Sequence, residues 1–388
     1  MLTLLTNVEG SMSFNGLRQA RTARGWSQRR LVAGIEQYAR QRGLSVASTV
    51  SLSVYVSEWE NGKRTISTEY AAILRGVLGL TDAELFGSVT AQAVATLDGY
   101  DELVTRIEAV RSLSAGMVDT LLSQTELLRP MDRQLGAPQL VDQMAAHLRT
   151  MEDALTFAVL PDARRPVARA LAGAATLAAW QALDVGAADR AWRHYELAKS
   201  AARDADEPAF LAHAMGEQAY VLADAGKAEL AIALVQEAQR AGHGRIPQRL
   251  VAWLQAAEAE LCALASRSEE CRHALDRASA VLPDGDDPRD PDMPSIFLNH
   301  SHLTRWRGNV LALLGDDQAA SDLHAALDAM DPTFVRAQAG VRGDLAQAHL
   351  VRGEHDEAMK QLQEARLLAS RTGSVRHLRR IERLTQAM

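Results

Sequence analysis

Apolar residues recur at helical spacing along nearly the whole chain. They lie three and four positions apart within residues 17–85, and the same period continues through residues 87–160, where Pro130, Gly136 and Pro138 divide it into two long stretches. Such a period gives a helix one buried face. Alanine and leucine dominate, whereas aromatic residues make up only 5% of the chain, which favours helices packed through small side chains over sheets. The sequence therefore predicts an all-α fold.

The length and the cysteine content limit the class of protein. At about 150 residues per domain, a chain of 388 residues should form two or three units. No apolar stretch reaches the roughly 18 to 20 residues that cross a bilayer, and the first ten residues have no basic region or cleavage pattern. Two cysteines, Cys262 and Cys271, cannot form a disulfide framework and are expected in the core. We expect a cytoplasmic protein with no membrane partner.

The net charge of −7 conceals an asymmetry along the chain. Residues 14–64 contain nine Lys and Arg against three Glu, so this segment carries +6 and the remainder carries −13. Unless these arginines only solvate a helix face, the segment is where a polyanion would bind.

Two helix ends can be read from the same segment. Ser27 can cap a helix that begins at the next residue. Asn61 and Gly62 tolerate the left-handed conformation that closes a helix, so a second helix within residues 52–60 should end there.

The residues around these two helices form a combined pattern. It consists of Leu17, Arg18, Arg21, Gly25, Trp26, Ser27, Gln28 and Leu31, followed by Val56, Ser57, Glu58, Trp59, Glu60, Asn61, Gly62 and Lys63. This combination resembles the phage-repressor-like helix-turn-helix regulators called the XRE family. The resemblance implies a DNA-binding domain over residues 14–86, whose second helix lies across the DNA backbone and whose third helix reads bases in the major groove of an operator.

The resemblance also assigns roles to individual residues. It implies base contacts from Ser53, Val54, Ser57 and Glu58, and phosphate contacts from Gln28, Arg29, Asn61, Lys63 and Arg64. Glu58 can accept a hydrogen bond from a cytosine amino group, and Val54 can touch a thymine methyl. Leu31, Val56, Trp59 and Leu74 are expected in the core, with Glu60 as an internal partner of Arg18 or Arg21.

One stretch departs from the usual spacing of that family. Residues 34–49 lengthen the stretch between the segment around Ser27 and the segment around Glu58 beyond what is usual in that family. We expect the second helix to extend to about Gln41, followed by a loop through Gly43 and Ser48, similar to actinobacterial members of the group.

Two flanking segments have open interpretations. Residues 1–13 are either a flexible arm or the product of a wrongly chosen start codon. The long helices of residues 87–165 either pack against a second copy of the chain or only cap the array that follows. A homodimer would suit operator half-sites about 34 to 36 Å apart.

Small residues recur in the last part of the chain at a spacing of seven, five and seven. The units are Ala179, Gly186, Ala191 and Ala198; Ala219, Gly226, Ala231 and Ala238; Ala259, Ser266, Cys271 and Ala278; Gly308, Gly315, Ala320 and Leu327; and Ala346, Gly353, Ala358 and Ala365. Each helix of an antiparallel pair needs a small residue where it crosses its partner, and a glycine suits the turn. The pattern predicts five helix hairpins, and it resembles the tetratricopeptide repeat.

This resemblance implies a superhelix over residues 166–388 that ends in a capping helix at 375–388. Its concave side would be an effector groove lined by Tyr220, Trp253, Gln255, Asn299, His302, Arg305, Asn309, Gln338 and Arg342. Asn and Gln can pair with a peptide backbone, and Arg with carboxylates. Repressor-like heads fused to such repeats include quorum-sensing receptors, so the resemblance implies a short peptide as the effector, with a small molecule or a protein as alternatives.

The chain lacks the usual motifs of enzymes. It has no Walker A loop, GxGxxG, GxSxG or HExxH motif. His300 and His302 are two apart and would point apart on a helix, and the acidic stretch at 284–294 lacks the ligand order of a calcium loop. We therefore expect no enzyme activity, cofactor or metal. Two function classes stay open: a transcriptional regulator that senses an effector, and a protein interaction scaffold that its DNA-binding head localises.

Overall fold

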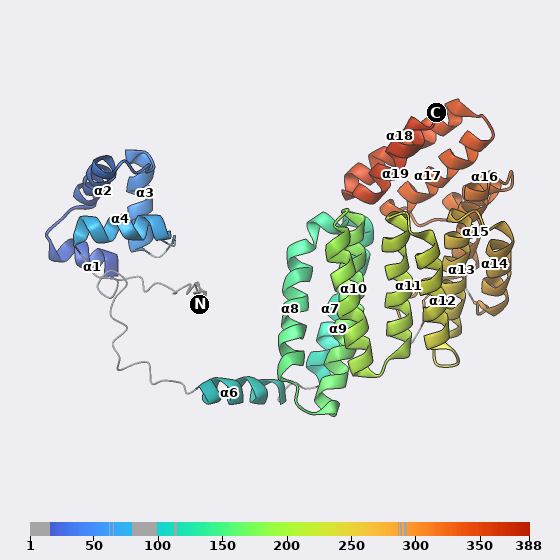
Figure 1. Cartoon of the computed structure of the whole chain (residues 1–388), viewed down its shortest axis with the longest axis horizontal. Coiled ribbons are helices and arrows are strands. Elements are labelled where there is room, and N and C mark those ends of the chain that lie inside the picture. Colours follow the sequence, from blue (N-terminus) through green and yellow to red (C-terminus); the bar gives the residue numbers. More distant parts are fainter. Residues whose placement is uncertain are drawn as a thin grey trace, which may run out of the picture. The chain divides into compact units, whose positions relative to one another are not determined.

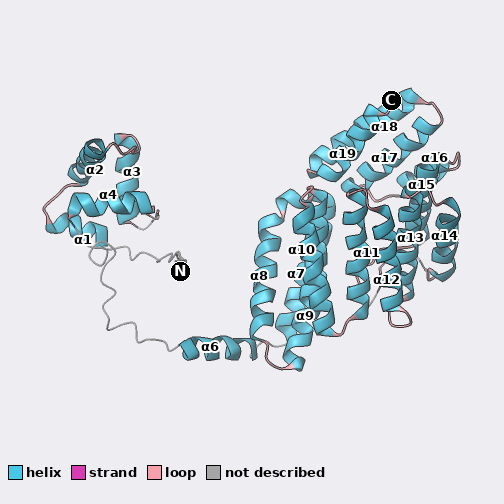
Figure 2. Cartoon of the chain, viewed as in Figure 1, coloured by secondary structure: helices cyan, strands magenta, loops and turns pink. Residues whose placement is uncertain are grey.

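The computed structural model describes residues 16–61, 63–64, 66–79, 99–111, 115–285, 287, 289–290 and 293–388. Within this part every regular element is a helix, apart from an isolated β-bridge between Arg289 and Phe297 (Figures 1 and 2). The all-α prediction is confirmed. The chain divides into two compact units, Met1–Leu103 and Val104–Met388, called here the N-terminal and the C-terminal unit. The predicted arm over residues 1–13 and the predicted boundary at residue 86 lie outside the described residues.

Four helices form the described core of the N-terminal unit. They are α1 (Gly16–Ala23), α2 (Gln28–Arg42), α3 (Thr49–Glu60) and α4 (Thr68–Leu78). α2, α3 and α4 each begin after a serine whose hydroxyl accepts a backbone N–H of the first turn: Ser27, Ser48 and Ser67. As predicted, Leu31, Val56, Trp59 and Leu74 are buried together in one apolar cluster.

The inserted stretch takes the form expected from the sequence. α2 runs to Arg42 and ends at Gly43, whose φ of 64° is the left-handed conformation that suits glycine. A loop then leads to Ser48, which caps α3. The end of α3 differs from the prediction in one respect: the helix stops before Asn61, but the φ of Asn61 is −104° and not left-handed. Its side chain closes the helix instead, since Nδ2 donates to the Ser57 carbonyl at 2.7 Å.

The helices of the C-terminal unit follow one another with mostly short connections, the longest of which, between α14 and α15, runs from residue 282 to residue 299. α6 (Gly99–Arg111) spans the boundary between the units, and the rest are α7 (Ala115–Leu135), the short 3-10 helix η1 (Ala137–Gln139), α8 (Val141–Phe157), α9 (Pro161–Asp184), α10 (Ala188–Ala205), α11 (Pro208–Asp224), α12 (Ala228–Gly242), α13 (Gln248–Leu264), α14 (Ser268–Val281), α15 (His300–Leu314), α16 (Ala319–Asp328), α17 (Val335–Val351), α18 (His355–Thr372) and α19 (Val375–Gln386). None of the helices in the described ranges is long and apolar enough to cross a membrane.

The spacing of small residues corresponds to five helix hairpins, from α9–α10 to α17–α18. The residue at each turn has a positive φ: 77° at Gly186, 73° at Gly226, 60° at Ser266, 75° at Gly315 and 73° at Gly353. The small residues lie where paired helices cross. A Cβ on Gly308, for example, would lie 2.8 Å from Cγ of Leu323 on the facing helix, so only glycine permits this approach.

The hairpins stack so that their first helices lie side by side. α9, α11, α13, α15, α17 and α19 contact one another in sequence. The array then returns to its beginning, because α17 and α18 contact α7, and α19 contacts α9. Figure 1 shows α17–α19, in red, beyond the upper ends of α7 and α9–α11. The expected superhelix with an open groove is therefore closed at this point.

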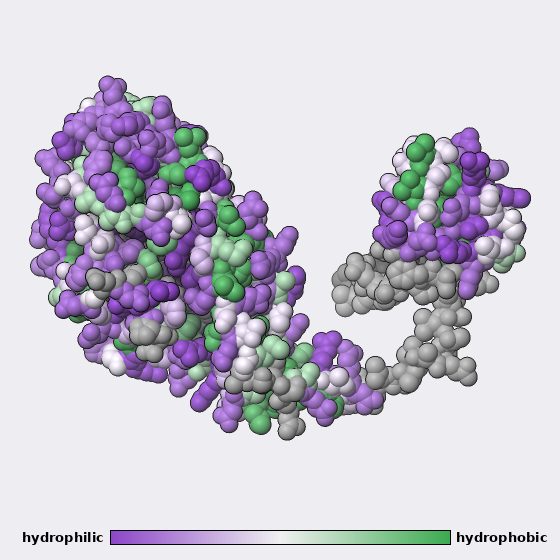
Figure 3. Space-filling model, turned by 180° about the vertical axis from the view of Figure 1, so that it is seen from behind, coloured by the Kyte–Doolittle hydropathy of each residue, from purple (hydrophilic) through white to green (hydrophobic). Residues whose placement is uncertain are grey.

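Residues assigned to a connector take part in this closure. α7 and α8 pack against α9 and belong to the C-terminal unit, as a capping role would require. Gly136, after α7, approaches the last hairpin so closely that a Cβ would lie 1.9 Å from the carbonyl oxygen of Thr372. The face of this unit seen in Figure 3 is largely hydrophilic, with apolar side chains in separate patches.

Candidate DNA-binding face and ligand pocket

The outer face of α3 brings together the residues predicted to read bases. Ser53, Val54, Ser57 and Glu58 line one open depression together with Asn61 and Lys63. They share this side because residues three and four apart lie on the same face of a helix. The opposite face carries the buried side chains Leu52, Val56, Trp59 and Glu60. Val54 is 50% exposed and Val50 on the same helix is 78% exposed, so α3 presents apolar as well as polar groups.

Glu60 connects α1 to α3, as expected from the sequence, and it also connects α2 to α3 through Gln28, which was not expected. Its side chain is fully buried and accepts hydrogen bonds from Arg21 at 2.5 and 3.0 Å. Arg18 Nε lies 3.7 Å from the same carboxylate. Burial alone would raise the pKa of Glu60, but the hydrogen bonds from Arg21 and Gln28 and the nearby positive charges lower it. This ion pair connects α1 to the last residue of α3.

The same network changes the interpretation of Gln28. Its Nε2 donates to Glu60 Oε2 at 2.9 Å, so the amide side chain points into the structure and not toward a bound phosphate. Asn61 is also engaged internally, since its Oδ1 accepts from Arg18 at 2.7 Å. The predicted phosphate contacts of these two side chains are therefore not supported by their geometry. Both help to hold the helices together.

The other predicted phosphate ligands remain at the surface. Arg29 and Lys63 are exposed. Arg64 lies over the Tyr55 ring, 3.7 Å from its centroid, and pairs with Glu58 at 3.3 Å. Arg64, which was predicted to bind a phosphate, thus neutralises Glu58, which was predicted to read a base.

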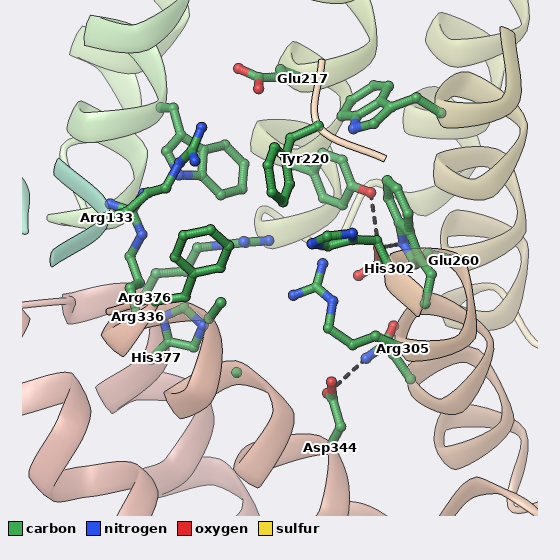
Figure 4. Close-up of a pocket in the computed structure, with 18 of the residues that line it drawn as sticks. Arg133, Glu217, Tyr220, Glu260, His302, Arg305, Arg336, Asp344, Arg376 and His377 are labelled. Atoms are coloured by element: carbon green, nitrogen blue, oxygen red, sulfur yellow. Dashed lines mark hydrogen bonds between the residues drawn. The ribbon is translucent and has the colours of Figure 1, made fainter. Parts of the chain in front are cut away.

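The C-terminal unit encloses a cavity of about 450 Å³ at the centre of its closed array. Side chains from α7, α9, α11, α13, α15, α17 and α19 reach it, together with the segment before α15 (Figure 4). Six aromatic residues form much of its wall: Trp180, Tyr220, Trp253, Phe297, Trp306 and Phe334. Several meet edge to face, such as Trp253 and Trp306 at 5.7 Å between ring centroids, which makes the wall rigid.

Five of the nine predicted groove residues line this cavity: Tyr220, Trp253, His302, Arg305 and Asn309. The other four do not. Asn299 caps α15 by accepting the His302 backbone N–H at 3.0 Å, and Gln338 donates to the carbonyl of Pro332 at 3.1 Å. Arg342 pairs with Glu364 at 2.5 Å, and Gln255 is not among the lining residues. The phase of α13 and α17 turns Gln255, Gln338 and Arg342 away from the centre, and Asn299 is placed by its role as a cap.

The closure adds residues that the sequence did not reveal. α7 contributes Arg129, Asp132 and Arg133, α17 contributes Arg336, and α19 contributes Arg376, His377, Arg380 and Arg383. This last segment was expected to form a capping helix, and its basic residues were not assigned to the groove. Their density on one short amphipathic helix was the available signal, but nothing in the sequence gave their direction.

Most charged groups of the cavity wall form ion pairs. Arg336 contacts Asp132 at 2.6 Å and Asp184 at 3.4 Å, Arg376 contacts Asp224 at 2.6 Å, and Arg380 contacts Asp344 at 2.5 Å. The half-buried Glu260 accepts hydrogen bonds from Tyr220 at 2.9 Å and Trp306 at 2.6 Å. These pairs join α17 and α19 to the first helices of the array, so they hold the cavity closed.

The described residues contain no group of three or more His, Cys, Asp or Glu that could hold a metal ion. Burial raises the pKa of Cys262 to about 12 and that of Cys271 to about 11, so both thiols stay protonated in the core. No model of a known protein family matches this chain, and no curated protein sequence matches it.

Proposed function

We propose that this protein is a sequence-specific DNA-binding transcriptional regulator whose C-terminal unit binds an effector. The observation that carries the proposal is the outer face of α3, where Ser53, Val54, Ser57 and Glu58 lie together with Lys63. This face belongs to a segment with a charge of +6 in a chain of net charge −7. A polyanion would be attracted to that segment and to few other parts of the chain.

The dimensions and chemistry of α3 suit the major groove. A helix with side chains is about 10–12 Å wide, close to the width of that groove. Exposed Val50 and Val54 can touch thymine methyl groups, and Glu58 can accept from a cytosine amino group. Glu58 becomes free for this contact if Arg64 turns away from the Glu58 carboxylate on binding. A DNA phosphate would attract Arg64, because a guanidinium forms bidentate hydrogen bonds with a phosphate.

The cavity of the C-terminal unit supports an effector of small size. A volume of about 450 Å³ lies within the range of small-molecule sites. A protein partner, as a scaffold would bind, usually covers about 800 Å² of open surface on each side. A ligand that binds the closed array more tightly than an opened one would shift the equilibrium between them, which is the requirement for an effector response.

A homodimer is part of the proposal. α7 exposes Leu127, Met131 and Leu135, at 67%, 39% and 45% exposure, and their spacing of four gives one apolar stripe along the helix. A second copy packed on this stripe would provide the two DNA-reading heads that a two-fold operator needs.

A footprint on the strongest genomic site, made with full-length protein at physiological salt, tests the proposal. The double variant S57A/E58Q should change which operator sequence is preferred, because it removes base-edge contacts. K63A should weaken binding to all sequences alike and lower the salt dependence by about one charge. K227A, an exposed lysine of the C-terminal unit, is the matched control.

An unprotected duplex, or binding that depends only on salt and not on sequence, would overturn the proposal. A preserved operator preference in S57A/E58Q would overturn the assignment of base reading to this face of α3.

A further inference from the structure

Arg133 and Arg305 are partly buried guanidinium groups of the cavity wall. Neither forms an ion pair with any carboxylate of the described residues, whereas Arg336, Arg376 and Arg380 each do. Arg383, which has no such ion pair either, is exposed. Arg305 Nε is buried without a hydrogen-bond partner. Arg133 lies over the rings of Phe297 and Phe334, at 5.0 and 5.4 Å from their centroids. Both groups are held in place without a counter-ion.

The two arginines approach one region of the cavity from opposite sides. Figure 4 shows Arg305 and His302 projecting from α15, with Arg133 on the facing wall. His302 also contacts Phe297, with 4.5 Å between ring centroids. Burial, together with the charges of Arg305 and Arg133, lowers the pKa of His302 to about 4. The imidazole is therefore neutral at pH 7 and does not add to the local charge.

The hydrogen bonds of His302 fix the state of its ring. Asn299 Oδ1 accepts the His302 backbone N–H, so this atom is an acceptor, and it lies 2.5 Å from Nδ1. Nδ1 must then carry the proton, which leaves Nε2 as an acceptor. The region thus offers two cationic donors and one neutral acceptor.

The charge of Arg133 is only partly compensated by its neighbours. Burial and the charges of Arg129 and Arg336 lower the pKa of Arg133 by more than the charges of Glu126 and Asp132 raise it. Buried polar atoms of other lining residues also lack partners. The Ser295 hydroxyl can donate to a carboxylate, whereas Asp132 Oδ1 and Asn309 Oδ1 can only accept and need donor groups of a ligand or water. Native proteins pair almost all such atoms, so a cluster of them at a cavity points to a bound molecule.

We propose that this cavity binds a small organic carboxylate, held between Arg133 and Arg305, with an apolar planar body against Trp253 and Phe297. The inference rests on the proposed function, since this ligand would be the effector. A guanidinium fork matches a carboxylate, whereas Glu217 and Glu260 on the same wall disfavour a group with two negative charges. Because Arg133 is on α7 and Arg305 on α15, the ligand would join opposite parts of the array and stabilise its closed form.

The carboxylate of the ligand can belong to one of two kinds of molecule, a free organic acid or the C-terminus of a short peptide. Calorimetric titration of the full-length protein distinguishes them with matched probes: 2-naphthoate against 2-naphthamide, and the tripeptide Leu-Leu-Phe against its C-terminal amide. We expect at least one acid to bind with one site per chain, and its amide to bind about tenfold more weakly or worse, because a charged hydrogen bond is lost. The acid that binds more tightly identifies the source.

Variants assign the binding to the two arginines. R133Q and R305Q should each weaken the acid about tenfold or more without changing the affinity for the amide, and R305K should retain part of it. R366Q, an exposed arginine on α18, is the control. Circular dichroism establishes that each variant is folded. A variant that fails to fold is replaced by the lysine substitution at the same position.

Equal affinity for acid and amide, no binding of either acid, or full affinity in both R133Q and R305Q would overturn the inference. A footprint on DNA without ligand, measured on the same samples, separates this result from the proposed function. No acid binding by the wild-type protein together with a retained footprint refutes only the ligand, and acid binding by the wild type without a footprint refutes only the DNA-binding proposal.

Discussion

The ion pairs of Arg336 give the sharpest test of the closed array. This guanidinium is 11% exposed and joins α17 to Asp132 of α7 and Asp184 of α9, whose side chains are 1% and 2% exposed. In R336Q both carboxylates stay buried without a counter-charge. Removing one partner of a buried ion pair costs about 3–5 kcal/mol. For a unit of this size that lowers the melting temperature by on the order of 10 °C.

Thermal unfolding of the full-length protein, followed by circular dichroism at pH 7, measures this change. R352Q is the control, because its ion pair with Glu354 is 41% and 39% exposed and an exposed pair contributes about 0–1 kcal/mol. Equal, small effects in both variants would refute the buried connection between α17 and the first helices of the array.

Acid provides a second check on the same pairs. Burial alone would raise the pKa of Asp184, but hydrogen bonds from His377 and Ser374 and the charge of Arg336 lower it. A carboxylate with a lowered folded pKa stabilises the fold above its unfolded value near 3.9, and this stabilisation is lost as the pH falls through the folded pKa. Protonation would relieve the unpaired charge in R336Q. The difference in melting temperature from wild type should therefore shrink below about pH 4, and a constant difference would contradict the assignment.

Three further predictions concern other parts of the chain. Ser266 occupies a turn with a φ of 60°, which is strained for any residue except glycine, so S266G should stabilise the C-terminal unit by about 0.5–1 kcal/mol. G226S should destabilise the unit by a similar amount. Urea unfolding that finds no gain in S266G would refute this backbone strain. E60Q removes the buried partner of Arg21 and should destabilise the N-terminal unit by about 3–5 kcal/mol. Because the pKa of Glu60 is lowered, the wild-type unit should lose this stability below about pH 4.3. A pH profile of stability that is as flat for the wild type as for E60Q would contradict this prediction. L127E on the exposed stripe of α7 should shift the chain from dimer to monomer in sedimentation at fixed concentration. L367E, at an equally exposed leucine on α18, should leave the dimer intact. A monomeric wild type would remove the dimer from the proposal.

Local features of the fold could be read from the sequence because they depend on nearby residues. Ser27 before Gln28 marks the start of α2, and the turn residues of the hairpins follow from a need for small residues and positive φ at fixed spacing. The internal role of Glu60 could be anticipated because a carboxylate in an apolar cluster needs a cationic partner.

The closure could not be predicted in this way. Arg336 and Asp132 are 204 positions apart, and no local pattern indicates that α17 returns to α7. The cavity is therefore built partly by residues that had been assigned to other tasks, such as Arg133 in the connector and Arg376 in the cap. Helical phase explains why Gln255, Gln338 and Arg342 face elsewhere, since a small error in rotation per residue accumulates along a long helix; Asn299 instead caps α15. The internal contact of Gln28 could not be read from the sequence, because its acceptor, Glu60, lies 32 positions away.

Genome-wide DNA occupancy of the tagged full-length protein, followed by a footprint on the strongest site at physiological salt, tests the central claim most directly. The account predicts discrete peaks that share an inverted-repeat motif, with protection centred on two half-sites. Diffuse occupancy without a shared motif would contradict a sequence-specific regulator, and it would assign the N-terminal unit to localisation alone.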